Sequence, residues 1–224
     1  MNSVGDAFGF AFRDPAWFGK IVVQGLIGII PIIGWIAAFG WMLMTLDNMR
    51  AGRQELPPAG FHLSRGIGLF GVYVLYAIVL NIPGWILQLA GGGGLHQVCN
   101  SDNVCSYNYA AAGPIAALGS LLGFVASLFL YFLLPSLIVM VYHHGFAGGF
   151  AFGQVWASAT ANIGNSVIGG LIIWVAGLIG GLGILVCCVG LLFTIPYSIT
   201  IQAGVAAWFQ RMQAAPAAPA APAA

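Results

Sequence analysis

Charged side chains are scarce in this sequence. Only 5% of its 224 residues are Asp, Glu, Lys or Arg, whereas 60% are hydrophobic. Ordinary soluble domains carry about a quarter charged residues, so this chain has too little polar surface to cover a globule in water. Between Gly66 and Gln210 the one charged side chain is Asp102. Such a stretch needs lipid as its solvent, which predicts a multi-pass integral membrane protein.

Sequence patterns of catalysis and nucleic-acid binding are lacking too. The five acidic residues all lie outside the apolar segments, so paired carboxylates for acid–base chemistry have little to be built from. The sequence has no phosphate-binding glycine loop, nucleophile elbow or zinc-protease motif. A net charge of +1 without a basic patch argues against a nucleic-acid partner. We therefore expect no enzymatic activity, no cofactor and no metal site.

The long apolar segments predict an all-α transmembrane bundle of four to five spans. We expect crossings at residues 66–90 and 114–142, and two more within 166–209 that are joined by a tight turn near 183–190. Residues 1–212 are predicted to form a single transmembrane domain. The low-complexity Ala/Pro tail that follows is predicted to be disordered.

The first apolar segment, residues 19–46, does not fit a simple crossing. It is longer than the ~20 residues of one straight span and shorter than the ~40 of two spans. Pro31 lies in its middle and removes a helical hydrogen bond. The segment is therefore either one kinked span or a broken, re-entrant hairpin. On either side of the spans, aromatic and polar residues predict interfacial amphipathic helices over residues 6–18 and 143–165.

Basic residues predict the orientation, because Lys and Arg in short loops stay on the cytoplasmic side. Three arginines place the loop 47–65 inside, and alternation then puts the loop 91–113 outside and the C-terminus in the cytoplasm. A single crossing by residues 19–46 would leave Arg13 and Lys20 outside, whereas a hairpin would put all six basic residues inside. This asymmetry favours the broken, re-entrant form of residues 19–46. We expect the protein to lie in the cell (cytoplasmic) membrane.

Three groups of residues are candidates for sites or contacts. Cys99 and Cys105 are spaced for a small disulfide loop on the outer side, with free thiols or metal binding as alternatives. Amides within spans serve either helix contacts or a polar path beside the proline breaks: Gln24, Asn81 and Gln202. Small residues that recur every four positions allow helices to approach closely, within one chain or in a homo-oligomer: Gly119, Gly123, Gly177 and Gly181.

The N-terminal third resembles a known family. Its pattern is an aromatic run into Arg-Asp-Pro-x-Trp, an Ile-Pro-Ile-x-Gly break, and a basic loop ending in Leu-Pro, here FAFRDPAWFGKIVVQGLIGIIPIIGW and RAGRQELP. The family comprises uncharacterised bacterial and archaeal multi-pass membrane proteins grouped by a domain of unknown function. The resemblance implies an architecture and assigns no active residues.

Two functions are compatible with these observations. The first is a non-enzymatic accessory or scaffold subunit that contacts the lipid bilayer, other membrane proteins or a second copy of itself. The alternative is a passive permease for small solutes or lipids. A dry, glycine-packed bundle would favour the first function, and a polar, water-accessible cavity around the buried amides would favour the second.

Overall fold

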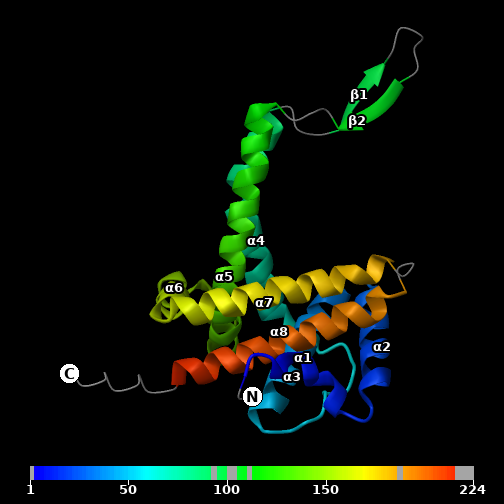
Figure 1. The fold of residues 1–224 in the computed structure, drawn as a ribbon, viewed down its shortest axis with the longest axis vertical. Coiled ribbons are helices and arrows are strands. Elements are labelled where there is room, and N and C mark those ends of the chain that lie inside the picture. Colours follow the sequence, from blue (N-terminus) through cyan, green and yellow to red (C-terminus); the bar gives the residue numbers. More distant parts are fainter. Residues whose placement is uncertain (1–2, 92–94, 100–104, 110–112, 186–188, 215–224) are drawn as a thin grey trace, which may run out of the picture. The chain divides into compact units, whose positions relative to one another are not determined.

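The computed structural model describes residues 3–91, 95–99, 105–109, 113–185 and 189–214, and its main elements are helices (Figure 1). The helices are α1 (Asp6–Gly9), α2 (Trp17–Gly28), α3 (Ile33–Arg50), α4 (Leu63–Ala90), α5 (Pro114–Phe150), α6 (Phe152–Ala161), α7 (Ile163–Leu182) and α8 (Leu191–Ala214). Two 3₁₀ turns, η1 (Ala11–Arg13) and η2 (Gly183–Leu185), and two strands, β1 (Leu95–Cys99) and β2 (Cys105–Tyr109), complete the set. The all-α prediction is confirmed.

The chain forms two compact units. Unit 1 comprises Met1–Val72 and Tyr131–Ala224, and unit 2 comprises Tyr73–Leu130. Helices α4 and α5 contribute residues to both units, and each unit has its own packing.

The hydropathy correctly predicted the membrane-spanning helices. Four of the described helices are long and apolar enough to cross a membrane: Leu63–Ala90, Pro114–Phe150, Ile163–Leu185 and Leu191–Ala214. The last two are separated at the predicted place, near residues 183–190. The second extends beyond the predicted end at Tyr142 and kinks at Gly145, where φ is +63°.

The first apolar segment is broken into two helices. Helix α2 has 12 residues, which is about 18 Å and too short for a ~30 Å hydrocarbon core. Pro31 lies in the turn that follows, and Ile32 has a φ of +65°, a backbone region that β-branched residues rarely adopt. At the turn the two helices lie close together, because a Cβ on Gly34 would be 2.5 Å from the Ile27 carbonyl oxygen. Helix α3 then runs back from the turn.

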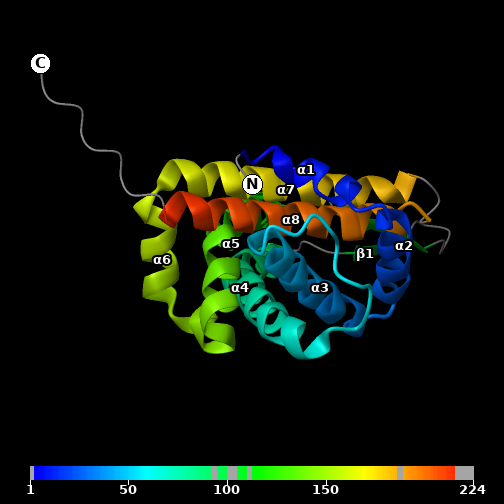
Figure 2. The ribbon, with the colours of Figure 1, turned by 90° about the horizontal axis from the view of Figure 1, so that it is seen from below.

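Helix α8 is central to unit 1. It contacts α1, α2, α3 and α7, and Figures 1 and 2 show α7 lying beside it. A helix that is apolar on all sides belongs in such a core position. Near its C-terminal end, Trp208 and Phe209 are buried against Val139 of α5.

Glycines permit the closest helix contacts in unit 1. A Cβ on Gly25 of α2 would lie 2.0 Å from the Leu192 carbonyl oxygen of α8. A Cβ on Gly170 of α7 would lie 2.6 Å from the Tyr131 carbonyl oxygen of α5. Both distances are shorter than any van der Waals contact, so only glycine allows these backbones to meet. In lipid the hydrophobic effect does not drive helices together, so close van der Waals contacts of this kind stabilise their association instead.

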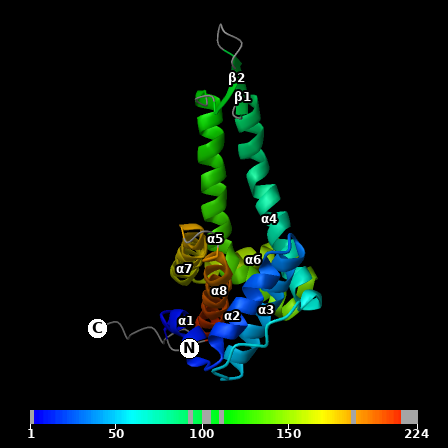
Figure 3. The same cartoon turned by 90° about the vertical axis from the view of Figure 1, so that its right-hand side faces the viewer.

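In unit 2, the facing parts of α4 and α5 lie side by side (Figure 3). A Cβ on Gly84 of α4 would be 2.9 Å from the Gly119 carbonyl oxygen. The polar loop predicted for residues 91–113 contains an antiparallel hairpin of β1 and β2. Five-residue strands in a short polar segment give only a weak period-two pattern, which is why they were missed.

The register of this hairpin places Cys99 directly opposite Cys105. Opposed residues of an antiparallel pair have Cα atoms roughly 4.5–5.5 Å apart, which lies within the range of disulfide-bonded cysteines. The disulfide itself stays a prediction.

We predict that Gly25→Ala lowers the free energy of unfolding by about 3 kcal/mol, because the new methyl group would overlap the Leu192 carbonyl. The matched control is Gly19→Ala in the same helix, where a Cβ would meet nothing within 4 Å. That change should be neutral or stabilise by ~0.5–1 kcal/mol through helix propensity. Thermal unfolding in detergent measures both, and equal stability of the two variants would contradict this account of the α2–α8 contact.

Candidate functional site

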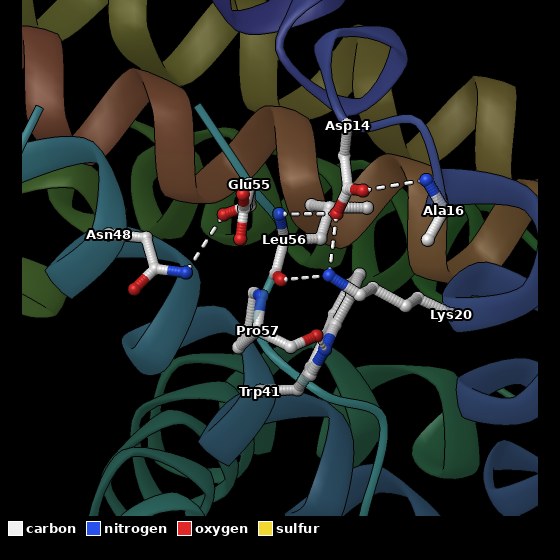
Figure 4. Close-up of polar contacts among 8 residues, drawn as sticks. All are labelled: Asp14, Ala16, Lys20, Trp41, Asn48, Glu55, Leu56 and Pro57. Carbon is white, nitrogen blue, oxygen red and sulfur yellow. Dashed lines mark hydrogen bonds and ion pairs between the residues drawn. The ribbon is translucent and has the colours of Figure 1, made fainter. Parts of the chain in front are cut away.

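A buried carboxylate joins the start of α2 to the segment that follows α3 (Figure 4). Asp14 is 2% exposed. Its Oδ1 atom accepts the Ala16 N–H at 2.7 Å, and its Oδ2 atom accepts the Leu56 N–H at 2.8 Å. Lys20 donates to the same Oδ2 and to the Leu56 carbonyl, both at 2.7 Å. The hydrogen bond from Leu56 makes this a long-range contact, because it joins residues 42 positions apart.

Two further hydrogen bonds fasten the same segment to α3. The Trp41 Nε1–H donates to the Pro57 carbonyl at 3.3 Å, and the Asn48 side chain donates to the Glu55 carbonyl at 2.8 Å (Figure 4). Because Leu56 is bonded to the start of α2 and Glu55 to the end of α3, the two ends of the broken segment meet. The segment is thus a helical hairpin.

Opposing effects act on the pKa of Asp14. Burial raises this pKa. The ion pair with Lys20 and the hydrogen bonds from the backbone N–H groups of Ala16 and Leu56 lower it, and together they outweigh burial, so the net shift is downward from 3.8. The carboxylate is therefore charged at neutral pH, and its hydrogen-bond partners hold it in place.

The basic residues of unit 1 gather around residues 47–56. Arg13 donates to Gln54 at 3.0 Å, and Arg65 forms an ion pair with Asp47. Arg50 and Arg211 line one hollow of about 210 Å³ between the ends of α3 and α8. With Lys20 at Leu56 and Arg53 inside the segment itself, all six basic residues lie at the polar end of the hairpin.

The opposite end of the hairpin is apolar and uncovered. Its exposed side chains are Ile29, Ile30, Ile32 and Ile33, at 65%, 38%, 64% and 43%. A turn of four exposed isoleucines is unsuited to water, and it matches immersion in lipid.

A cavity of about 470 Å³ lies between α2, α3 and the start of α8. Its volume falls within the range of small-molecule sites, ~300–1,000 Å³. The buried part of its lining includes Gln24, Gly25, Pro196 and Ile199, whereas Ile29 and Val189 are exposed. The cavity thus opens between the end of α2 and the start of α8, towards the apolar end of the hairpin.

Gln24 is the one polar side chain among the described residues that line this cavity. It is 1% exposed, and its Oε1 atom accepts the Gly60 N–H at 3.1 Å. Its Nε2 atom has no hydrogen-bond partner within the described part of the chain. An unpaired buried donor costs about 1–3 kcal/mol, which makes Gln24 the centre of the candidate site.

The other two predicted amides have partners on their own helices. Gln202 is partly buried in α8 and donates to Ser198 at 3.4 Å. Asn81, in unit 2, donates to the Ala77 carbonyl at 2.8 Å. Gln202 and Asn81 are thus each bonded to their own helix, and within unit 1 the amides of Gln24 and Gln202 have different partners.

The four glycines predicted for helix packing differ in how closely a neighbouring residue approaches them. A Cβ on Gly119 would lie 2.6 Å from the Gln88 backbone nitrogen, which makes this a close contact within unit 2. Gly123 and Gly177 make ordinary contacts at 3.5 and 3.7 Å, and a Cβ on Gly181 would meet nothing within 4 Å. Gly25 and Gly170 also make close contacts, at 2.0 and 2.6 Å, and neither was predicted from the sequence.

This arrangement of apolar spanning helices defines a multi-pass helical membrane protein. The chain belongs to the family described as "Protein of unknown function (DUF4013)", which matches residues 23–189. The expected membership of an uncharacterised family is thereby confirmed. No curated protein and no solved structure matches the chain.

We predict that Asp14→Asn lowers the free energy of unfolding by about 3 kcal/mol at neutral pH, because Lys20 then loses its charged partner. Since the folded-state pKa of Asp14 is lowered from 3.8, the ion pair stabilises the fold above that pH. Its contribution is lost as the pH falls through the folded-state pKa.

The difference between wild type and variant should therefore shrink below about pH 4, as measured by unfolding in detergent across the pH range. Glu55→Gln, at an exposed side chain, is the matched control and should leave the stability unchanged. An Asp14→Asn variant as stable as Glu55→Gln at neutral pH would contradict this role of Asp14.

Proposed function

We propose that this protein is a non-enzymatic accessory subunit of a membrane assembly, which acts through contacts of its helices with lipid and with a second membrane protein. The observation that carries the proposal is the glycine-packed bundle of unit 1, in which helix backbones meet at Gly25 and Gly170. A close-packed bundle of this kind suits a scaffold and is less suited to a protein that must open a path.

The lining of the cavity supports the same proposal. Ion-coupled transport and acid–base catalysis normally use ionisable groups within the membrane. Gln24 is neutral, and the described residues around it are apolar or glycine. A single amide offers neither a proton relay nor a nucleophile.

One observation favours the alternative, a passive permease for small solutes or lipids. The unpaired Nε2 atom of Gln24 could hold a passing polar group, and broken helices often border transport sites. Within unit 1, Gln24 is bonded to Gly60 and Gln202 to Ser198, which weighs against one polar path through both amides.

We also propose that the protein lies in the cytoplasmic membrane with its C-terminus in the cytoplasm. All six basic residues gather at one end of unit 1, and Arg211 is in the last turn of α8. Positive residues remain on the cytoplasmic side and attract anionic headgroups there. The hollow between Arg50 and Arg211 suits such contacts.

The proposal is tested by gentle purification of the tagged protein from its native membrane, followed by mass spectrometry. We expect a second membrane protein, or a second copy of this chain, at a stoichiometric ratio. An unrelated membrane protein with the same tag is the control for adventitious capture.

A lone protein without a stoichiometric partner would contradict the accessory role. Reconstitution into liposomes then tests the alternative, because a permease releases an entrapped solute and an accessory subunit does not.

A further inference from the structure

The orientation of the Gln24 amide is determined by its surroundings. The Oε1 atom accepts the Gly60 N–H at 3.1 Å. The flipped amide would set its own N–H groups against that donor, so the assignment of oxygen and nitrogen is fixed by this contact. Two N–H donors on Nε2 are left, in a side chain that is 1% exposed and lines the cavity.

The chemistry of the cavity restricts what can pair with these donors. The partner must supply a hydrogen-bond acceptor, because Nε2 is donor only. It must also be neutral, because the described lining residues offer no counter-charge and a buried unpaired ion is very unfavourable. The rest of the occupant must be apolar to match walls such as Pro196 and Ile199.

The opening of the cavity indicates where the occupant comes from. Ile29 and Val189 border it and are 65% and 59% exposed. These side chains belong to the apolar end of unit 1, so a molecule dissolved in the hydrocarbon layer reaches the opening without crossing water.

We propose that this cavity binds an apolar chain with a neutral carbonyl oxygen, which accepts a hydrogen bond from Nε2 of Gln24. Two kinds of membrane molecule share this chemistry, the acyl ester of a lipid and the carbonyl of an isoprenoid quinone. This proposal rests on the proposed function, because it names a membrane molecule that the protein contacts. The two are tested independently: co-purified protein partners test the accessory role, and ligand binding tests the cavity.

Two glycines of α2 provide a matched pair of variants. Gly28 lines the cavity, and a Cβ there would meet nothing within 4 Å, so Gly28→Leu can fill the space without displacing the backbone. Gly19 in the same helix also has nothing within 4 Å of a Cβ, but it does not line the cavity. Gly19→Leu therefore gains the same helix propensity as Gly28→Leu, but it leaves the cavity open.

The test is native mass spectrometry of the delipidated full chain with two probes, methyl oleate and 1-octadecene. Both are long apolar chains, and only the first has a carbonyl oxygen. We expect wild type and Gly19→Leu to bind methyl oleate roughly fivefold to tenfold more tightly than 1-octadecene, the effect of one hydrogen bond. Gln24→Leu should lose this preference, and Gly28→Leu should lose binding of both probes.

Equal binding of the two probes by wild type, or equal binding of methyl oleate by Gly28→Leu and Gly19→Leu, would overturn the proposal. Because the two glycine variants keep Gln24 and its bond to Gly60, the test does not depend on the stability of Gln24→Leu. Organic extraction of wild type and Gly28→Leu from native membranes then distinguishes the sources. Enrichment of an acyl lipid or of a quinone in wild type supports the proposal and names the source, and enrichment of neither overturns it.

Discussion

The buried carboxylate of Asp14 is the interaction on which the structure of unit 1 depends. Removal of a carboxylate from water costs several kcal/mol unless charge and hydrogen bonds replace the solvent, and here Lys20 and two backbone N–H groups do so. These contacts hold the segment after α3 against the start of α2. The same segment then brings the Gly60 N–H to Gln24. The polar end of the hairpin thus determines which atom of the buried amide is left without a hydrogen-bond partner.

In unit 1, a polar, positively charged end and an apolar, exposed end are separated by the length of one short helix, α2. All six basic residues lie at the polar end, and four exposed isoleucines lie at the turn. Helix α2 is too short to cross a bilayer, at about 18 Å. A hairpin that enters the lipid and returns reconciles its length with both ends. The cavity lies towards the turn, where lipid is the nearest solvent, and this position is the reason for expecting an apolar ligand.

Much of this architecture is predictable from sequence, because lipid imposes strict requirements on composition. Uninterrupted apolar length predicts the four spans, and Pro31 predicts the break in the first segment. Contacts between distant residues leave no such signal. The bond from Leu56 to Asp14 joins residues 42 positions apart, and the closeness at Gly25 depends on where α8 lies. Gln24 was singled out as a polar residue in a span, but its unpaired nitrogen depends on Gly60, which no local pattern indicates.

The hairpin is tested most directly by the side of the membrane on which its two ends lie. In a chain with all four cysteines replaced by serine, single cysteines are introduced as Ser3→Cys before α2 and Ala51→Cys after α3, both at exposed positions. A membrane-impermeant maleimide is then applied to sealed vesicles of each orientation. The hairpin predicts that both cysteines react from the same face, and the proposed orientation makes this the cytoplasmic face. Reaction from opposite faces would show that the segment crosses the membrane once and would contradict the hairpin.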